Sequence, residues 1–234
     1  VAIGLDDYFV DRHLTPLDED GNADFEALEA IDLELFNEHL TKLIQGEAVQ
    51  VPTFHFPTGR RQWNGKTLQV RSDQPIIVEG IHGLNDKLTA SIPKGRKFKI
   101  YISALTNLNL DHHTRISTTD VRMLRRMIRD NQFRGLDARA TIERWPSVTR
   151  GEHRHIFPFQ ESADVMFNST LVYELAVLKP LAEELLREIT PGEPQYSEAR
   201  RMLRFLQHFV AVEDWSAIPC NSLLQEFIGG SCFE

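Results

Sequence analysis

The stretch VAIGLDDYF, residues 1–9, places a short apolar segment directly before two adjacent carboxylates, Asp6 and Asp7. An unbroken run of aliphatic residues is typical of a strand that is buried in a parallel sheet. A second such segment, PIIVEGI at residues 75–81, contains Glu79 close to its end. In open parallel sheets, ligands bind beyond the carboxyl ends of the strands. We therefore expect Asp6 and Glu79 to lie near a ligand.

The rest of the chain alternates between similar strands and segments with helical periodicity. Besides residues 1–5 and 75–81, apolar segments predict buried strands at 97–103 and 163–168. The predicted helices span residues 24–45, 119–131, 136–144, 171–189 and 196–208. This alternation predicts an α/β fold, with a parallel sheet and helices on both of its faces.

Residues 50–72 depart from the alternation. Asn64 and Gly65 form a typical hairpin turn sequence between alternating segments. Pro52 and Pro57 are incompatible with a central strand because proline cannot donate to a strand ladder. We therefore predict a β-hairpin flap over residues 50–72.

The composition restricts the class of protein. A chain of 234 residues can bury one sizeable core, so we expect a single domain over residues 1–234. No apolar run approaches the roughly 20 residues of a membrane helix, which argues against a membrane protein. The net charge of −8 argues against a stable nucleic-acid partner. Two cysteines are too few for a disulfide framework, and this favours a cytoplasmic location.

The strongest signal for an anion site is DVRMLRRMIRDNQFRG, residues 120–135. Four of its arginines recur at helical spacing on one face, and apolar residues form the opposite face. Guanidinium groups suit the bidentate binding of phosphate oxygens, so we predict a polyphosphate ligand. The alternative is a solvated face, for which Asp120 and Asp130 are the available ion-pair partners. The five arginines are Arg122, Arg125, Arg126, Arg129 and Arg134.

A third group of candidate residues combines aromatic rings, basic side chains and one acid. Aromatic rings can stack on a planar base, and an acid such as Asp24 can hold the hydroxyls of a sugar. Alternating phenylalanines also occur in ordinary cores, and the spacing leaves that alternative open. The group contains Phe54, His55, Phe56, Arg60 and Arg61, with His82 after the second strand.

The motifs LDDYFVDR, VEGIHGLN, WPSVTRGE and EFIGGS, together with the arginine stretch, resemble the bacterial uridine kinase-related nucleoside kinases. These enzymes belong to the phosphoribulokinase/uridine kinase group of P-loop enzymes. The resemblance implies a P-loop NTPase-like kinase core with a lid at about 119–151 and a C-terminal helical part at about 171–234. It also implies transfer of the γ-phosphate of ATP or GTP, with Mg²⁺, to the 5′-hydroxyl of a nucleoside, foremost uridine or cytidine.

The resemblance assigns roles to individual residues. Asp6 would be the catalytic base, and Asp6 and Glu79 would hold Mg²⁺. The expected nucleoside-binding residues are Phe9, Asp24, Phe54, Phe56, Arg61 and His82. The expected phosphate-binding lid residues are Arg122, Arg126, Arg129 and Arg134. The expected partners are a nucleoside and a nucleoside triphosphate, and a homo-oligomer stays open.

Two departures from the family pattern limit these expectations. Gly59 stands where the uridine-cytidine kinases place a base-recognising histidine, which leaves the base open. The phosphate-binding sequence G-x-x-x-x-G-K-[ST] is absent from the 234 residues. The resemblance then implies that this loop lies upstream of Val1 and that the chain alone is inactive. The alternatives are a kinase for another small alcohol, such as a phosphorylated sugar or pantothenate, and a non-catalytic nucleotide-binding module.

Overall fold

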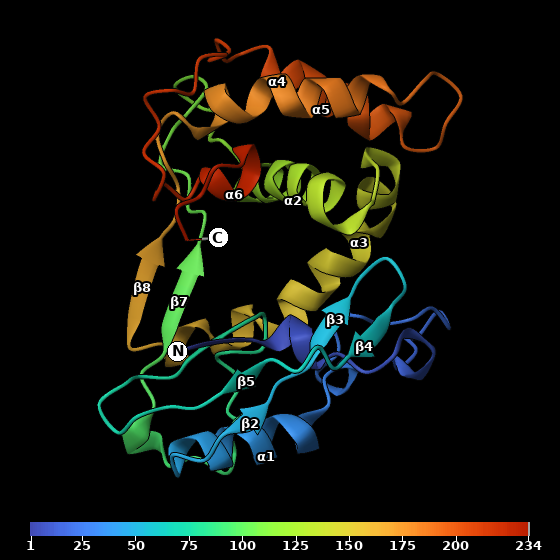
Figure 1. The fold of residues 1–234 in the computed structure, drawn as a ribbon. Coiled ribbons are helices and arrows are strands. Elements are labelled where there is room, and N and C mark those ends of the chain that lie inside the picture. Colours follow the sequence, from blue (N-terminus) through green and yellow to red (C-terminus); the bar gives the residue numbers. More distant parts are fainter. Residues whose placement is uncertain (234) are drawn as a thin grey trace. The chain divides into compact units, whose positions relative to one another are not determined.

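The computed structural model describes residues 1–233 (Figure 1). The chain forms two compact units. Unit 1 contains residues 1–101 and 147–166, and unit 2 contains residues 102–146 and the chain from Phe167 onward. The expectation of a single domain stays a prediction.

Unit 1 begins with the expected parallel strand pair. Strand β1 (Ala2–Gly4) pairs with β6 (Ile77–Glu79) in parallel, and Gly4 lies opposite Glu79. The chain then enters a 3-10 turn, η1 (Leu5–Tyr8). With three residues per turn, this geometry places its first and last residues on the same side. Leu5 and Tyr8 are accordingly buried, whereas the two acids between them are half-buried.

The core of unit 1 forms around η1 and helix α1 (Leu33–Ile44). The Tyr8 ring packs edge-on against Phe36, with a centroid distance of 5.2 Å. The Tyr8 hydroxyl forms a 3.0 Å hydrogen bond with His39 Nδ1. Asp32 caps the helix by accepting a hydrogen bond from the Leu35 N–H. The sequence IGLDDYF is thus fixed on its buried side by apolar contacts with α1.

The segment predicted as a flap contains two antiparallel strand pairs. Strand β3 (Thr53–His55) pairs with β4 (Arg60–Gln62), and β2 (Val49–Gln50) pairs with β5 (Thr67–Leu68). The hairpin turn between β3 and β4 ends at Gly59, which has a φ of 64°. Asn64-Gly65 instead lies between β4 and β5, so the predicted position of the tight turn was wrong.

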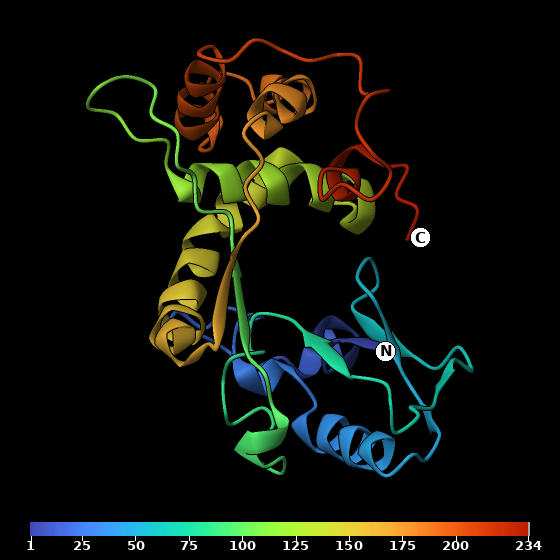
Figure 2. The same cartoon turned by 90° about the vertical axis from the view of Figure 1, so that its left-hand side faces the viewer.

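Strands β7 (Ile100–Ser103) and β8 (Val165–Asn168) form another two-stranded sheet, and both run from unit 1 into unit 2 (Figure 2). Ile102 is 61% exposed and Phe167 is 51% exposed. The prediction that the apolar strands are buried was therefore wrong for this pair. Within the described residues each sheet has only two strands, so part of their apolar surface lacks a covering layer.

Unit 2 is helical. Helix α2 (Thr118–Arg134) starts at Ser117, whose Oγ accepts a hydrogen bond from the Asp120 N–H. It ends at Gly135, which has a left-handed φ of 65°. The apolar face of α2 is buried, as the sequence predicts.

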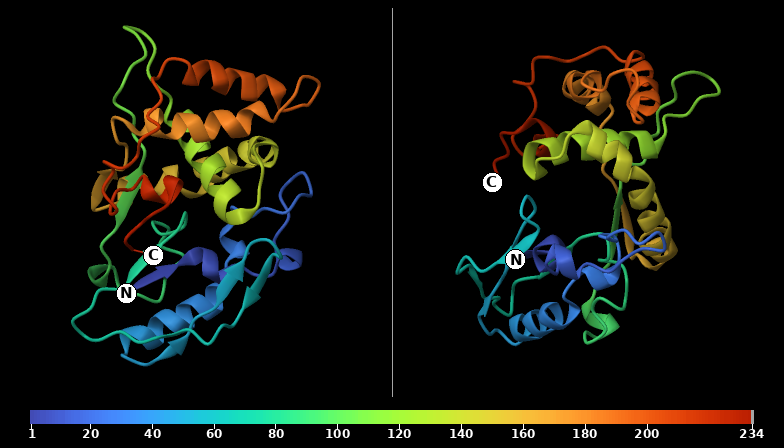
Figure 3. Two further views of the ribbon diagram at one scale, coloured as in Figure 1. Left: turned by 45° about the horizontal axis from the view of Figure 1, so that its top comes forward. Right: turned by 90° about the vertical axis from the view of Figure 1, so that its right-hand side faces the viewer.

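Three further helices pack in unit 2. Helix α4 (Glu174–Arg187) packs on both α2 and α5 (Tyr196–Leu206), and α6 (Gln225–Ile228) packs on α2 (Figure 3). Helix α3 (Ala138–His155) continues from unit 2 into unit 1 and contains Pro146. The remaining 3-10 helices are η2 (Arg12–Leu14), η3 (Leu28–Ala30), η4 (Lys94–Arg96) and η5 (Phe157–Ser162). Among the described residues, none of the helices has the length and apolar character needed to span a bilayer.

Candidate functional site

The carboxyl ends of β1 and β6 form an acidic edge in unit 1. The register pairs Gly4 with Glu79, so Glu79 lies beside the start of the turn that carries Asp6 and Asp7. A Cβ atom at position 4 would lie 2.8 Å from Glu79 Oε1 and 3.9 Å from Asp7 Oδ2. The carboxylates of Glu79 and Asp7 thus lie next to the position that a methyl group on Gly4 would occupy. The sequence predicts a pairing of Glu79 with Asp6, whereas the acid that borders Gly4 together with Glu79 is Asp7.

Asp7 connects the acidic edge to the hairpin, a role that the sequence did not reveal. Its Oδ1 accepts a 3.3 Å hydrogen bond from the Phe54 N–H. Burial raises the pKa of Asp7, the Phe54 hydrogen bond and Lys66 oppose the rise, and the charge of Asp6 adds to it. Its position next to Asp6 was the available signal, but only the fold shows which acid faces β3.

The donor set at this edge suits Mg²⁺. That ion prefers oxygen ligands and is commonly held by one or two carboxylates, with waters and substrate phosphates completing the shell. Glu79 and Asp7 supply such oxygens beside Gly4, whose missing Cβ leaves room for the Glu79 carboxylate, and Asp6 lies in the same turn as Asp7. Among residues 1–233, no group of three or more His, Cys, Asp or Glu side chains forms a metal site of its own. Two carboxylates at one edge fit the share of a Mg²⁺ shell that a protein commonly supplies.

Three phenylalanines that the resemblance assigns to nucleoside binding gather in one cluster. The Phe9 ring lies 5.5 Å from Phe54 and 6.5 Å from Phe56, measured between centroids. Phe54 and Phe56 are 5.3 Å apart. Phe54 is buried, while the other two rings are half-buried. Since the Phe54 N–H also contacts Asp7, the aromatic cluster adjoins the acidic edge.

Arg61 is engaged with the start of α1. Its Nη1 donates a 2.7 Å hydrogen bond to Asp32 Oδ2, on the same carboxylate that caps the helix. Burial favours a higher pKa for Asp32, but the hydrogen bonds from Arg61 and Leu35 outweigh it and lower the pKa. The Arg61 N–H donates to Asp11 Oδ1 at 2.9 Å. In this structure Arg61 orders the hairpin and the α1 terminus.

Asp24 and His82 lie in another part of unit 1 and are linked through His155. Asp24 and His155 line a small cavity of about 10 Å³, room for one water. Asp24 Oδ1 accepts a 3.0 Å hydrogen bond from the Glu26 N–H. His82 is 1% exposed, and its ring centroid lies 5.0 Å from that of His155. Burial, and next the charge of His155, lower the pKa of His82 to about 4.

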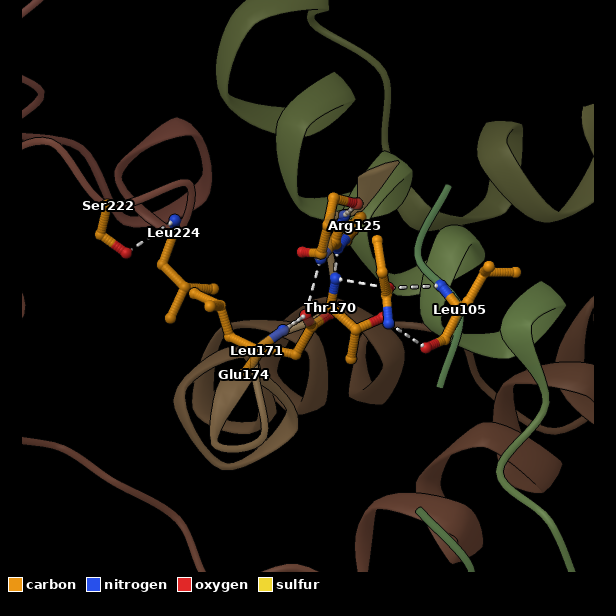
Figure 4. A network of polar contacts seen from close by, with 9 residues as sticks. Leu105, Arg125, Thr170, Leu171, Glu174, Ser222 and Leu224 are labelled. Atoms are coloured by element: carbon orange, nitrogen blue, oxygen red, sulfur yellow. Dashed lines mark hydrogen bonds and ion pairs between the residues drawn. The ribbon is translucent and has the colours of Figure 1, made fainter. Parts of the chain in front are cut away.

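Arg125 of unit 2 has a structural role, which corrects its assignment to the phosphate-binding face. Its Nε and Nη2 donate to the Glu174 carboxylate at 2.9 and 2.6 Å (Figure 4). Its Nη1 and Nη2 also donate to the Ser169 Oγ and carbonyl oxygen. Glu174 is buried at the first turn of α4. This network joins α2 to α4.

Three other arginines of α2 converge on Asp130, which is 1% exposed. Arg126 Nε lies 3.3 Å from Asp130 Oδ2. Arg129 Nε and Arg134 Nη1 lie 3.6 and 3.4 Å from Asp130 Oδ1. Like charges repel at such distances, so one buried carboxylate allows three guanidinium groups to gather. We call these three residues and Asp130 the arginine cluster.

Comparison with known proteins identifies the family. Residues 11–176 match the model of the phosphoribulokinase/uridine kinase family. The uridine kinases of Staphylococcus aureus strains JH9 and Newman are each 31% identical to this chain over 169 residues. The aligned residues cover 71% of this chain and 72% of each relative. The chain belongs to the phosphoribulokinase/uridine kinase family.

The part that matches the phosphoribulokinase/uridine kinase family covers most of the candidate site. It contains the hairpin, Glu79 and the whole of α2, and it ends within α4. Asp6 and Phe9 lie just before it. Family membership identifies a kinase, a class of transferase, and nucleotide substrates follow from that class. Sequence reasoning did not identify Asp130 as the shared ion-pair partner of three arginines. The signal was available, because Asp130 stands four residues after Arg126 and four before Arg134.

Proposed function

We propose that the chain is the acceptor-binding and catalytic part of a nucleoside kinase. It transfers the γ-phosphate of ATP or GTP to the 5′-hydroxyl of a nucleoside, with uridine and cytidine as the first candidates. One observation supports this most directly: the acidic edge of Asp6, Asp7 and Glu79 adjoins the aromatic cluster through the Asp7–Phe54 hydrogen bond. A hydroxyl-activating group and a ring-binding surface side by side are what a nucleoside acceptor requires.

In this proposal Asp6 accepts the proton of the 5′-hydroxyl and orients its oxygen for attack. Asp6 and Glu79 hold Mg²⁺, which neutralises phosphate charge when bound. Phe9, Phe54 and Phe56 enclose the base. Asp7 fixes β3 relative to the acids through its hydrogen bond with the Phe54 N–H.

We also propose that Asp24, Arg61 and His82 contribute to nucleoside binding. Asp24 is half-buried and bears the carboxylate that suits ribose hydroxyls. Arg61 and His82 act through their neighbours, because Arg61 is paired with Asp32 and His82 is buried against His155.

The phosphates of the donor are proposed to bind Arg122, Arg126, Arg129 and Arg134. Arg126, Arg129 and Arg134 are already gathered by Asp130 and remain partly exposed. Guanidinium groups placed in advance can stabilise charge on the transferring phosphoryl group without reorganisation. In P-loop enzymes phosphoryl transfer also needs a G-x-x-x-x-G-K-[ST] loop, which these 234 residues do not contain, so we expect no turnover from this chain alone.

The test is a panel of acceptors supplied to the complete gene product with MgATP or MgGTP, and nucleoside diphosphate release is measured. The panel contains uridine, cytidine, adenosine, ribulose 5-phosphate and pantothenate. We expect uridine or cytidine to give the highest kcat/KM. A higher kcat/KM for ribulose 5-phosphate or for pantothenate would mean that the acceptor is another small alcohol and not a nucleoside.

A non-catalytic nucleotide-binding module is the second candidate, favoured by the absence of the phosphate-binding sequence from these residues. It predicts binding of uridine or of ATP by calorimetry without turnover of any acceptor by the complete gene product. Turnover of a nucleoside would exclude it.

A further inference from the structure

The two cysteines of the chain, Cys220 and Cys232, lie together in unit 2. Both are free and exposed. The Cys232 N–H donates a 3.0 Å hydrogen bond to the Cys220 carbonyl oxygen, and the two thiols are hydrogen-bonded to each other. Standard bond lengths limit the Cα separation of two residues joined by one such backbone bond to less than about 7 Å. Disulfides take separations of about 4.4–6.8 Å, so the backbone here is compatible with one.

The chain between the two cysteines is already folded into a closed loop. It contains α6, and Gln225 Nε2 donates to the carbonyl oxygens of Ile218 and Pro219 at 3.2 and 3.1 Å. Gly229 and Gly230 have φ values of 81° and 87°, which turn the chain back towards its start. Bond formation between the thiols therefore requires little rearrangement of the backbone.

This loop packs on the helix that carries the arginines. Gln132 Nε2 donates a 2.7 Å hydrogen bond to the Phe227 carbonyl oxygen. Arg129 Nη1 lies 3.5 Å from Glu226 Oε1, and the Arg125 guanidinium lies 5.6 Å from the centroid of the Phe227 ring. A covalent bond that closes the loop would hold these contacts in place.

We propose that Cys220 and Cys232 form a redox-active pair that is oxidised to an intramolecular disulfide by low-molecular-weight disulfides such as glutathione disulfide. One cysteine thiolate attacks a sulfur of glutathione disulfide and releases one glutathione thiolate. The second cysteine, after losing its proton to solvent, attacks the protein-bound sulfur and releases the second glutathione. Two protein thiols are oxidised and one glutathione disulfide is reduced to two thiols.

The hydrogen bond with Cys220 raises the pKa of the Cys232 thiol. The thiolate is the attacking species, so we expect the rate of disulfide formation to increase with pH. In a reducing compartment, a disulfide of this kind is transient and senses oxidation.

The experiment treats the chain, at low micromolar concentration, with glutathione disulfide and then measures its mass without reduction. We expect the oxidised chain to be lighter by two hydrogen atoms, monomeric, and without a glutathione adduct. The matched controls are Cys220→Ser and Cys232→Ser, each of which should retain one glutathione. A wild-type chain that carries two glutathiones, or a disulfide-linked dimer, would overturn the proposal.

Hydrogen exchange then tests whether the disulfide constrains the loop. We expect the amides of residues 222–228 to exchange more slowly in the oxidised chain than in the reduced chain, while those of α5 stay unchanged. Equal exchange of residues 222–228 in both forms would contradict closure of the loop.

Discussion

At the scale of single residues, one 3-10 turn in LDDYF buries two hydrophobic side chains and leaves the two acids between them half-buried. Leu5 and Tyr8 enter the core, whereas Asp6 and Asp7 are half-buried and the Asp7 carboxylate lies near Gly4 at the end of β1. The sequence predicted the acids at a strand end because an apolar run stops before them. It could not predict the hydrogen bond between Asp7 and the Phe54 N–H of β3, because that contact joins residues far apart in the chain.

Replacing the proposed base tests the chemistry directly. Asp6→Asn should lower kcat of the complete gene product by at least 100-fold, because asparagine cannot accept the hydroxyl proton. Uridine affinity, measured by calorimetry, should stay close to that of the wild type. Asp20→Asn, at an exposed loop acid, is the control. Near-normal turnover of Asp6→Asn would remove Asp6 from the role of base.

Gly4 tests the proposed metal edge. A methyl group there would meet Glu79 Oε1 at 2.8 Å and displace the carboxylate. We expect Gly4→Ala to raise the Mg²⁺ concentration that gives half-maximal activity of the complete gene product several-fold. Gly95→Ala serves as the matched control, because a Cβ there meets nothing within 4 Å. Equal Mg²⁺ requirements for the two variants would contradict a metal role for Glu79.

Asp130 holds three like charges together. Asp130→Asn should destabilise the fold by about 1–3 kcal/mol, a range reduced for the partial exposure of the arginines. It should also raise the KM for the donor triphosphate more than it changes the uridine affinity. Asp73→Asn, at an exposed ion pair with Arg71, should change stability by less than about 0.5 kcal/mol. An unchanged donor KM in Asp130→Asn would leave Asp130 with a structural role alone.

At the scale of elements, the sequence located strands and helices better than it described their surroundings. Each of the four predicted strands is present, because apolar β-branched runs determine local conformation. Their exposure depends on neighbouring layers, which no local pattern contains. The 24–45 helix starts at Leu33 because residues 28–30 form a 3-10 turn instead.

The turn of the hairpin shows why a local signal failed. Arg12 donates its N–H to the Gly59 carbonyl oxygen at 2.9 Å, and its Nη2 donates to the Phe56 carbonyl oxygen at 2.7 Å. These bonds come from a segment more than 40 residues away and fix the turn before Gly59. Asn64-Gly65 matches a common turn sequence, but no such contact selects it as the tight hairpin turn.

Two glycine substitutions distinguish the effect of the Arg12 contact on stability from the effect of backbone strain. Both Gly59 and Gly65 have positive φ, at 64° and 76°, so alanine costs about 1 kcal/mol at either position. At position 59 the Cβ would also lie 2.6 Å from Arg12 Nε, whereas at position 65 it meets nothing within 4 Å. Urea unfolding should therefore show a larger loss of stability for Gly59→Ala than for Gly65→Ala. Equal losses would mean that the Arg12 contact does not stabilise the turn.

At the scale of the whole molecule, stability should depend on pH through buried His82. Its pKa is about 4 in the folded chain and about 6.5 when unfolded, so the unfolded chain binds more protons between those values. The free energy of unfolding should fall by about 2 kcal/mol between pH 7 and pH 5 from this residue. Urea unfolding at both pH values measures this loss. In His82→Gln, the decrease in the free energy of unfolding between pH 7 and pH 5 should be smaller by that amount. The control is His112→Gln, at an exposed position, in which the full decrease should persist.

Neither compact unit is encoded by an uninterrupted piece of sequence. The chain passes between the units after Tyr101, after Pro146 and after Met166. Unit 1 is therefore complete only when Ser147–Met166 has joined the first 101 residues. During synthesis at about 5–20 residues per second, those first residues wait several seconds for their last partners. The acidic edge and the aromatic cluster leave the ribosome before residues 147–166, so we expect the unit that carries them to finish folding only after most of α3 has been made.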